Sequence, residues 1–254
     1  MSTDKWFTRK DHGDGIFEIG LNRAPVNALS TEFLLGTARL MDELAADQSV
    51  RAIVLSSPFK VFSAGLDLKE VKDFDRAQQD AIVSGLTAGF SALFMFPKPM
   101  VAAVTGAAIA GGLFYVVTTD FRVSGPRAKY GLAEVRVGAD FPAAPLEIAR
   151  ATLNPDALRR LMLSGQPMSA SEAATAGFVD VIEDDETAVL DRAIAAAREL
   201  ADSPPNTYAA IKHQIRQPVI DQITAANAEA ANAPDRGWFT DETRMAMQRM
   251  LSGS

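Results

Sequence analysis

Apolar residues recur along the chain with two spacings. Short, strongly apolar runs have the length of β-strands, and longer stretches carry apolar side chains three and four positions apart, as amphipathic helices do. The predicted strands are 16–21, 51–56, 100–105, 120–124 and 128–131. The predicted helices between them are 31–46, 76–96 and 111–119. Strands that alternate with helices predict an α/β fold.

The pattern changes after Asp184 and becomes helical throughout. Helices are predicted at 187–201, 207–231 and 241–251. The second of these is expected to bend or break near Pro218, because proline removes a backbone donor. We therefore divide the chain into an α/β core, residues 1–190, and a C-terminal helical subdomain, residues 191–254.

Two glycine-containing turns each follow a predicted strand. They read Phe62-Ser-Ala-Gly-Leu-Asp-Leu68 and Gly106-Ala-Ala-Ile-Ala-Gly-Gly112. Glycine permits a tight turn and lets a ligand approach the main chain, and a turn that starts a helix leaves peptide N–H groups unpaired. Two such turns can direct two N–H donors at one oxygen. This arrangement, an oxyanion hole, would stabilise an enolate or tetrahedral anion formed from a thioester.

These turns resemble the hallmark motifs of the crotonase family, also called the enoyl-CoA hydratase/isomerase family. The motifs are F-x-A-G-x-D-L/I and G-x-x-x-G-G-G, and Ala110 stands where the first of three glycines is common. The resemblance runs from about Gly15 to the C-terminus. It implies a crotonase-like spiral of ββα units, with peptide N–H groups of Leu66 and Gly111 as the oxyanion hole. It further implies that the C-terminal helices build a homotrimer or a hexamer, although packing against the core would also bury their apolar faces.

Composition narrows the function classes. The chain has 254 residues and a formal net charge of −7, which argues against general binding to nucleic acid or to an anionic membrane. It has no cysteine, which excludes thiolate chemistry. Its two histidines, His12 and His213, share no metal-ligand spacing and are expected at the surface. We therefore expect no metal ion. No apolar run approaches membrane-spanning length and the N-terminus lacks the apolar core of a signal peptide, so we expect a cytoplasmic protein.

Glu134 is the candidate proton-transfer group. Lys129-Tyr-Gly-Leu-Ala-Glu134-Val-Arg-Val-Gly138 resembles the family segment that carries a catalytic glutamate, commonly F-x-x-P-E-x-x-x-G. The surrounding sequence is mostly apolar, and burial would raise the pKa of this carboxyl towards the range of a base near neutral pH. A surface glutamate in a loop is the alternative interpretation.

The residue at position 114 distinguishes hydration from double-bond isomerisation. Family hydratases carry a second glutamate twenty residues before the first, and Phe114 occupies that position. One carboxylate is enough to move a proton from C2 to C4 of a 3-enoyl thioester, so the chain most resembles the Δ3,Δ2-enoyl-CoA isomerases of fatty acid β-oxidation. Phe114 would then form a dry wall of the pocket. Hydration, dienoyl-CoA isomerisation, thioester hydrolysis and acyl-CoA binding without catalysis are the alternatives.

Asp140 is a possible second acid in the loop after Glu134. Some relatives place an acid two positions later, where this chain has Pro142. Asp67 and Asp120 are expected to be structural, the former as the cap of a helix.

The resemblance also implies that coenzyme A enters as part of the thioester substrate, with no further cofactor. The family holds it with backbone atoms, which fall here on Arg23, Ala24, Val26, Ala64, Leu66, Asp67 and Leu68. Arg23 and Lys69 could also contact phosphates. The aromatic candidates for the acyl pocket, which core packing would explain equally well, are Phe74, Phe90, Phe94, Trp238 and Phe239. The sequence lacks the glycine patterns of nicotinamide and nucleotide sites.

Overall fold

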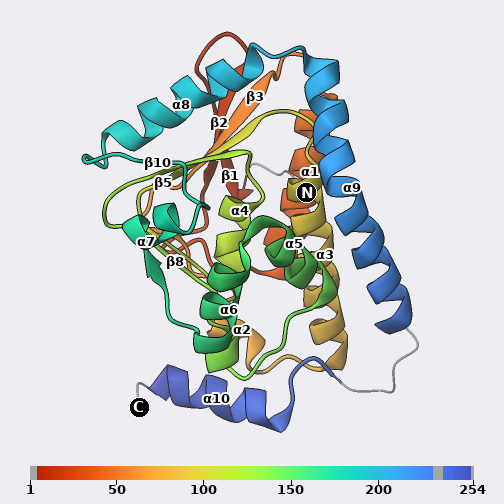
Figure 1. Cartoon of the computed structure of the whole chain (residues 1–254). Helices are drawn as coiled ribbons and strands as arrows, with labels where there is room; N and C mark the ends of the chain where they lie inside the picture. The colour runs from red at the N-terminus through yellow and green to blue at the C-terminus, as the bar shows by residue number, and fades with distance from the viewer. Residues whose placement is uncertain (1–4, 231–236, 253–254) are drawn as a thin grey trace.

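Two β-sheets form the centre of the molecule in the computed structural model, which describes residues 5–230 and 237–252 (Figure 1). The larger sheet has the order β1-β2-β3-β5-β7-β10, and the smaller sheet β4-β6-β8-β9. The larger sheet consists of β1 (Phe7–Asp11), β2 (Ile16–Leu21), β3 (Ala52–Ser56), β5 (Met100–Val104), β7 (Phe121–Ser124) and β10 (Val181–Ile182). The smaller consists of β4 (Val61–Ser63), β6 (Ala107–Ile109), β8 (Lys129–Gly131) and β9 (Met168–Ser169).

From β3 to β8, successive strands alternate between the two sheets. β3, β5 and β7 are parallel neighbours in the larger sheet, and β4, β6 and β8, which follow them in the chain, are parallel neighbours in the smaller sheet. Helices stand between the repeats, so the chain forms a spiral of ββα units. The α/β, crotonase-like fold expected from the sequence is confirmed.

The helices surround the sheets. They are α1 (Thr31–Ala46), α2 (Leu68–Val71), α3 (Arg76–Met95), α4 (Phe114–Val117), α5 (Ala143–Thr152), α6 (Pro155–Ser164), α7 (Ala170–Thr175), α8 (Ala188–Ala201), α9 (Pro205–Ala230) and α10 (Asp241–Ser252). Two short 3₁₀ helices, η2 (Ala110–Leu113) and η3 (Glu134–Arg136), carry candidate site residues. Figure 1 shows α9 beside α3 on one side of the molecule and α10 across one end.

The parallel strands β2, β3 and β5 of the larger sheet are buried on both faces, as parallel sheets require, whereas the antiparallel edge strand β1 has four exposed residues. Neighbouring residues of a strand point to opposite faces, so Ile53 belongs to the main core whereas Val54 belongs to a second core beneath α8. Ala193 and Ala197 of α8 are fully buried there, and their small side chains let the helix approach the sheet. This packing explains the apolar face of the alanine-rich helix.

Asp120 ties three elements together, in agreement with its predicted structural role. Its backbone N–H donates to the Met100 carbonyl at 2.7 Å, and its carboxylate accepts from the Met100 N–H at 2.9 Å. Lys212 and Arg216 of α9 donate to the same carboxylate at 2.6 and 2.7 Å. The two cationic side chains are buried, so this cluster fixes α9 to the start of β5.

Of the predicted bend or break near Pro218, the break does not occur, because α9 runs without interruption from Pro205 to Ala230. The bend stays a prediction. The carbonyl that Pro218 leaves without a donor belongs to Gln214, which is exposed to solvent. Lys212 and Arg216 anchor the turns before the proline and Ile223 is buried after it. Packing on both sides therefore holds the helix together.

The proposed domain boundary between residues 190 and 191 falls inside α8. The C-terminal helices pack in different places: α8 covers the larger sheet, and α9 contacts α3 and α5. Their part in an oligomer stays a prediction. No helix in the described ranges is both long and apolar enough to cross a membrane.

Candidate active site

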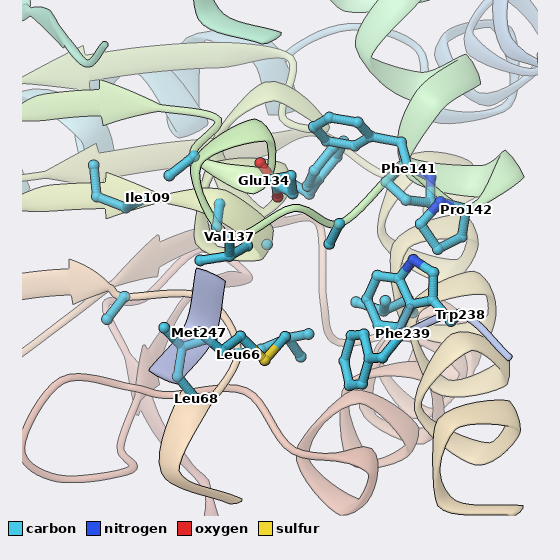
Figure 2. Close-up of a pocket in the computed structure, with 18 of the residues that line it drawn as sticks. Leu66, Leu68, Ile109, Glu134, Val137, Phe141, Pro142, Trp238, Phe239 and Met247 are labelled. Atoms are coloured by element: carbon cyan, nitrogen blue, oxygen red, sulfur yellow. The ribbon is translucent and has the colours of Figure 1, made fainter. Parts of the chain in front are cut away.

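A cavity of about 140 Å³ lies where the two glycine turns, η3, α3 and the C-terminal segment meet (Figure 2). Its wall is made almost entirely of apolar side chains and glycine backbone. Among the described residues that line it, Glu134 is the one with an ionisable side chain. The fold thus brings four of the predicted site residues, Leu66, Gly111, Phe114 and Glu134, to one cavity.

The first glycine turn is held by a single parallel bridge. The N–H of Leu29 donates to the Gly65 carbonyl at 2.7 Å, and the N–H of Asp67 donates to the Leu29 carbonyl at 3.3 Å. This pairing uses the peptide groups on either side of Leu66, so the N–H of Leu66 itself points away from Leu29.

The two turns touch each other, and this contact requires glycine. Gly65 has φ +79°, and a Cβ there would lie 2.9 Å from the carbonyl oxygen of Ile109. A Cβ on Gly111 would lie 2.8 Å from Cδ1 of Leu29. Ala110 has the left-handed φ of 51° although it is not glycine. The contact places the peptides of Leu66 and Gly111 on the same cavity.

Gly111 is the second residue of η2, where no preceding turn supplies an acceptor for its N–H. The preceding Ile109 gives no side-chain cap. Together with the outward N–H of Leu66, this geometry is compatible with two donors for one oxygen. The roles of Leu66 and Gly111 as oxyanion donors stay predictions.

Glu134 begins η3, and its backbone is tightly held. Its carbonyl accepts the N–H groups of Val137 at 3.0 Å and Ala139 at 3.1 Å. The residue as a whole is half-buried, but its Oε2 is buried and has no hydrogen-bond partner within the part of the chain that the structure describes. Burial raises the pKa of this carboxyl to about 7. Such a group can accept a proton and return it near neutral pH.

Phe114 fills the position at which a second acid was sought. Its side chain is 1% exposed and stacks on Phe90, with ring centroids 4.7 Å apart and an interplanar angle of 23°. Both rings line the cavity. Asp140 is exposed and does not line it, whereas its neighbours Ala139 and Phe141 do. The geometry therefore gives no support to Asp140 as a second acid.

The predicted coenzyme A residues divide into two groups. Ala64, Leu66 and Leu68 line the cavity, whereas Arg23, Ala24, Val26 and Asp67 lie outside it. The two loops are nevertheless joined, because the Ala64 N–H donates to the Val26 carbonyl at 3.0 Å.

Two charged or polar groups of these loops already have partners. Arg23 donates to the Ala28 carbonyl at 2.5 Å and pairs with Glu70 at 3.3 Å. Asp67 caps α2, accepting the Lys69 N–H at 3.1 Å, which confirms the predicted capping role. Binding of coenzyme A by these loops stays a prediction.

Among the aromatic candidates, Phe90, Trp238 and Phe239 line the cavity, and Phe74 and Phe94 belong to the core. Met247 and Met250 of α10 also line the cavity and were not predicted from the sequence. The sequence predicted a helix at 241–251 that carries both methionines, but it gave no signal that this helix faces the cavity. No group of three or more His, Asp or Glu side chains in residues 5–230 and 237–252 is arranged to hold a metal ion.

Known proteins similar to this chain are enzymes that act on enoyl-CoA thioesters, according to their names. The chain is 32% identical over 200 residues to a probable enoyl-CoA hydratase, EchA17, of Mycobacterium bovis, covering 78% of this chain and 76% of that protein. It is 34% identical over 184 residues to a putative enoyl-CoA hydratase of Thermus thermophilus, covering 71% and 72%. The structure of a Mycobacterium tuberculosis protein named an enoyl-CoA isomerase superposes with a TM-score of 0.79 at 30% identity, covering 91% of this chain and 100% of that one. A second structure of that protein, which also has a TM-score of 0.79, is named a probable enoyl-CoA hydratase, EchA3.

The fold, the relatives and the site define a crotonase-type acyl-CoA enzyme. The family described as enoyl-CoA hydratase/isomerase matches residues 11–251. The chain belongs to this family, and the resemblance drawn from its two glycine turns is confirmed at that level.

Proposed function

We propose that this enzyme is a Δ3,Δ2-enoyl-CoA isomerase of fatty acid β-oxidation, which uses Glu134 as its one proton shuttle. The observation that carries the proposal is that Glu134 is the one ionisable side chain among the described residues of an otherwise apolar cavity wall. This carboxyl has a raised pKa of about 7 and faces a cavity in which Phe114, stacked on Phe90, occupies the place of a second acid.

The reaction needs two proton transfers and no water. The Glu134 carboxylate removes a proton from C2 of a 3-enoyl thioester, and the C–H electron pair enters a dienolate. The N–H groups of Leu66 and Gly111 stabilise the negative charge on the thioester oxygen. Glu134 then returns the proton to C4, the double bond moves to C2–C3, and the carboxylate is regenerated.

Hydration makes a different demand. A water molecule must be held and activated while another proton is donated, which two carboxylates do better than one. Phe114 neither accepts nor donates a proton, and its buried ring fills space that a water would need. Relatives are named both hydratase and isomerase, so their names support either reaction. The apolar Phe114 in the cavity wall favours isomerisation, which needs no second acid.

We also propose that the chain assembles as a homotrimer or as a pair of trimers. Ile211 and Ile215 lie one turn apart on α9 and are 51% and 69% exposed. Sedimentation equilibrium of the purified protein would test the assembly. The cytoplasmic location and the lack of a cofactor stay predictions.

The test of the reaction is incubation with 3-hexenoyl-CoA in deuterated water. Conjugation to the thioester is followed by absorbance, and mass spectrometry separates enoyl from 3-hydroxyacyl products. A conjugated 2-enoyl product without hydroxyacyl-CoA is expected. Accumulation of 3-hydroxyacyl-CoA as the main product from 2-hexenoyl-CoA, without isomerisation of the 3-enoyl compound, would overturn the proposal in favour of a hydratase.

A further inference from the structure

The C-terminal segment 237–252 forms one wall of the cavity and is bonded to the loop that follows Glu134. The indole Nε1 of Trp238 donates to the Asp140 carbonyl at 3.1 Å, and Oγ1 of Thr243 donates to the Gly138 carbonyl at 2.6 Å. Trp238, Phe239 and Met247 of this segment line the cavity (Figure 2). The segment therefore contacts both the acyl pocket and the backbone of the catalytic loop.

The bond from Thr243 reaches Glu134 through one peptide group. The carbonyl of Gly138 and the N–H of Ala139 belong to the same planar unit. That N–H donates to the carbonyl of Glu134 at 3.1 Å. Thr243, the Gly138–Ala139 peptide and Glu134 thus form a short chain of hydrogen bonds, in which each bond polarises the next.

The packing around this chain leaves little freedom. Thr243 is completely buried. Gly138 has φ +66°, and a Cβ there would lie 3.2 Å from Cα of Thr243 and 3.3 Å from the Glu242 carbonyl oxygen. The backbone of α10 therefore lies directly against the catalytic loop, and a side chain at position 138 would push it away.

The start of the segment is also anchored to α3, through Gln79. This buried side chain accepts the Phe239 N–H at 2.9 Å and donates to the Phe74 carbonyl at 3.1 Å. Because α3 is a long helix packed in the core, its bond to Phe239 fixes the position of segment 237–252. The loop after Glu134, which this segment contacts, is thereby held in place.

We propose that Thr243 is a positioning residue for Glu134, which holds the catalytic carboxyl in its water-excluding orientation by fixing the Gly138–Ala139 peptide. The proposal rests on the proposed function only in taking Glu134 as the reacting group. Thr243 contacts no substrate in it. When the Thr243 bond is lost, the loop loosens, water reaches Glu134, and the carboxyl titrates closer to the pKa of an ordinary glutamate.

The charged residues near this loop, Asp140 of the loop itself included, are exposed and do not line the cavity. Glu134 is the one ionisable side chain among the described residues of the cavity wall. Arg136 of the same turn is exposed and lies over Gly165 at the end of α6. Glu242 and Asp241, which precede Thr243 on α10, are also exposed.

The test measures the titration of Glu134 directly. Protein labelled with ¹³C at glutamate carboxyl groups is titrated by NMR, and Glu134→Gln identifies the signal. Thr243→Val keeps the shape of the side chain but removes the hydroxyl. We expect its Glu134 midpoint to fall by about one pH unit and kcat to fall about fivefold to tenfold, with a smaller change in KM. A Thr243→Val protein whose Glu134 titrates as in the wild type would overturn the proposal.

Two controls separate positioning from helix capping. Thr243 also exchanges hydrogen bonds with Thr240, the residue before α10, at 3.1 and 3.3 Å. Thr240→Ala removes that capping hydroxyl but keeps the bond to Gly138, and Thr243→Ser keeps both. Both variants should titrate as the wild type does, and a shift in Thr240→Ala equal to that in Thr243→Val would assign the effect to capping and contradict the proposal.

Trp238→Phe provides a second variant if Thr243→Val does not fold. It retains an aromatic ring but loses the donor to the Asp140 carbonyl, and a smaller fall of the Glu134 midpoint is expected. No shift in this variant would then count against the proposal. Because the titration uses no substrate, a shifted midpoint without isomerase activity would retain Thr243 as a positioning residue and reject only the proposed reaction.

Discussion

Gly65 and Ala110 lie against each other at the point where the two glycine turns meet. A Cβ on Gly65 would lie 2.7 Å from the Cβ of Ala110. Position 110 already carries a side chain in the left-handed region, so position 65 has no room for another. The distance between the two peptides that form the proposed oxyanion hole is set by this contact.

Gly65→Ala should therefore impair both stability and turnover. Its φ of +79° alone costs an alanine about 1–2 kcal/mol, and the contact with the second turn adds to that. Gly13→Ala is the matched control, because Gly13 has φ +78° with nothing within 4 Å of its added Cβ. Urea denaturation should show a larger loss for Gly65→Ala, and equal losses would refute the steric argument.

Glu134→Gln should abolish isomerisation while acyl-CoA binding survives. Removal of a positioned acid–base group costs about 10²- to 10⁴-fold in rate. In the wild type, the carboxylate is the active form and its pKa is about 7, so kcat/KM should rise with pH through that region. Stopped-flow rates and calorimetric binding would check both statements. Near-wild-type turnover by the variant would assign the base elsewhere.

The same variant should change how stability depends on pH. The pKa of Glu134 is raised from 4.5 to about 7 in the folded protein, so the folded state binds this proton more tightly than the unfolded state does. The stabilisation is complete below pH 4.5 and is lost as the pH rises through 7. Between these limits the wild type should lose about 3 kcal/mol relative to Glu134→Gln. Parallel denaturation curves at both pH values would test this, and a constant difference would contradict it.

Phe114→Glu should introduce hydratase activity, because it places a second carboxyl beside the cavity that Glu134 lines. Burial of the new carboxyl and loss of the stacking on Phe90 should also lower stability by a few kcal/mol, about the cost of a disrupted core aromatic. Phe114→Leu removes the ring without adding an acid and should not hydrate. The product 3-hydroxyacyl-CoA is measured from 2-enoyl-CoA substrates, and its absence at every chain length would weaken the argument from the missing acid.

Asp120→Asn should be strongly destabilising. Lys212 and Arg216 would remain buried without their common carboxylate, and breaking a buried ion pair costs about 3–5 kcal/mol. Asp80→Asn removes the exposed pair with Arg76 on α3 and should cost less than about 1 kcal/mol. Thermal denaturation of both variants would show whether burial decides the difference.

The sequence predicted what depends on local pattern and on motif. The long apolar strands β2, β3 and β5 and the helix α1 appear where the apolar spacing placed them. β1, β4 and β6 were not predicted. β1 has one buried and four exposed residues, so it lacks an apolar run. β4 and β6 have three residues each and follow closely on longer predicted strands. Their pairing is set by the spiral, which brings together segments distant in sequence.

In the site, too, some residues could be predicted from local motifs, whereas other contacts depend on the fold. Glu134, Leu66 and Gly111 were located from motifs, because the glycine turns and the glutamate recur at fixed positions in the family. Their roles stay predictions. The bonds of Thr243 and Gln79 could not be predicted, since threonine and glutamine form such contacts on any surface. α9 shows the opposite error: a local rule for Pro218 was overruled by tertiary packing.

The closure of the chain at Met100 and Asp120 has an evolutionary consequence. Both ends of the segment between them are joined by backbone and carboxylate hydrogen bonds, and Gly111 and Phe114 lie inside it. Gly111 and Phe114 are therefore inherited together within one closed segment, whereas Leu66 and Glu134 lie outside it. A change at position 114 alters the wall opposite Glu134 and leaves the attachment at Met100 and Asp120 in place, so relatives can diverge in chemistry at this position while they keep the same base.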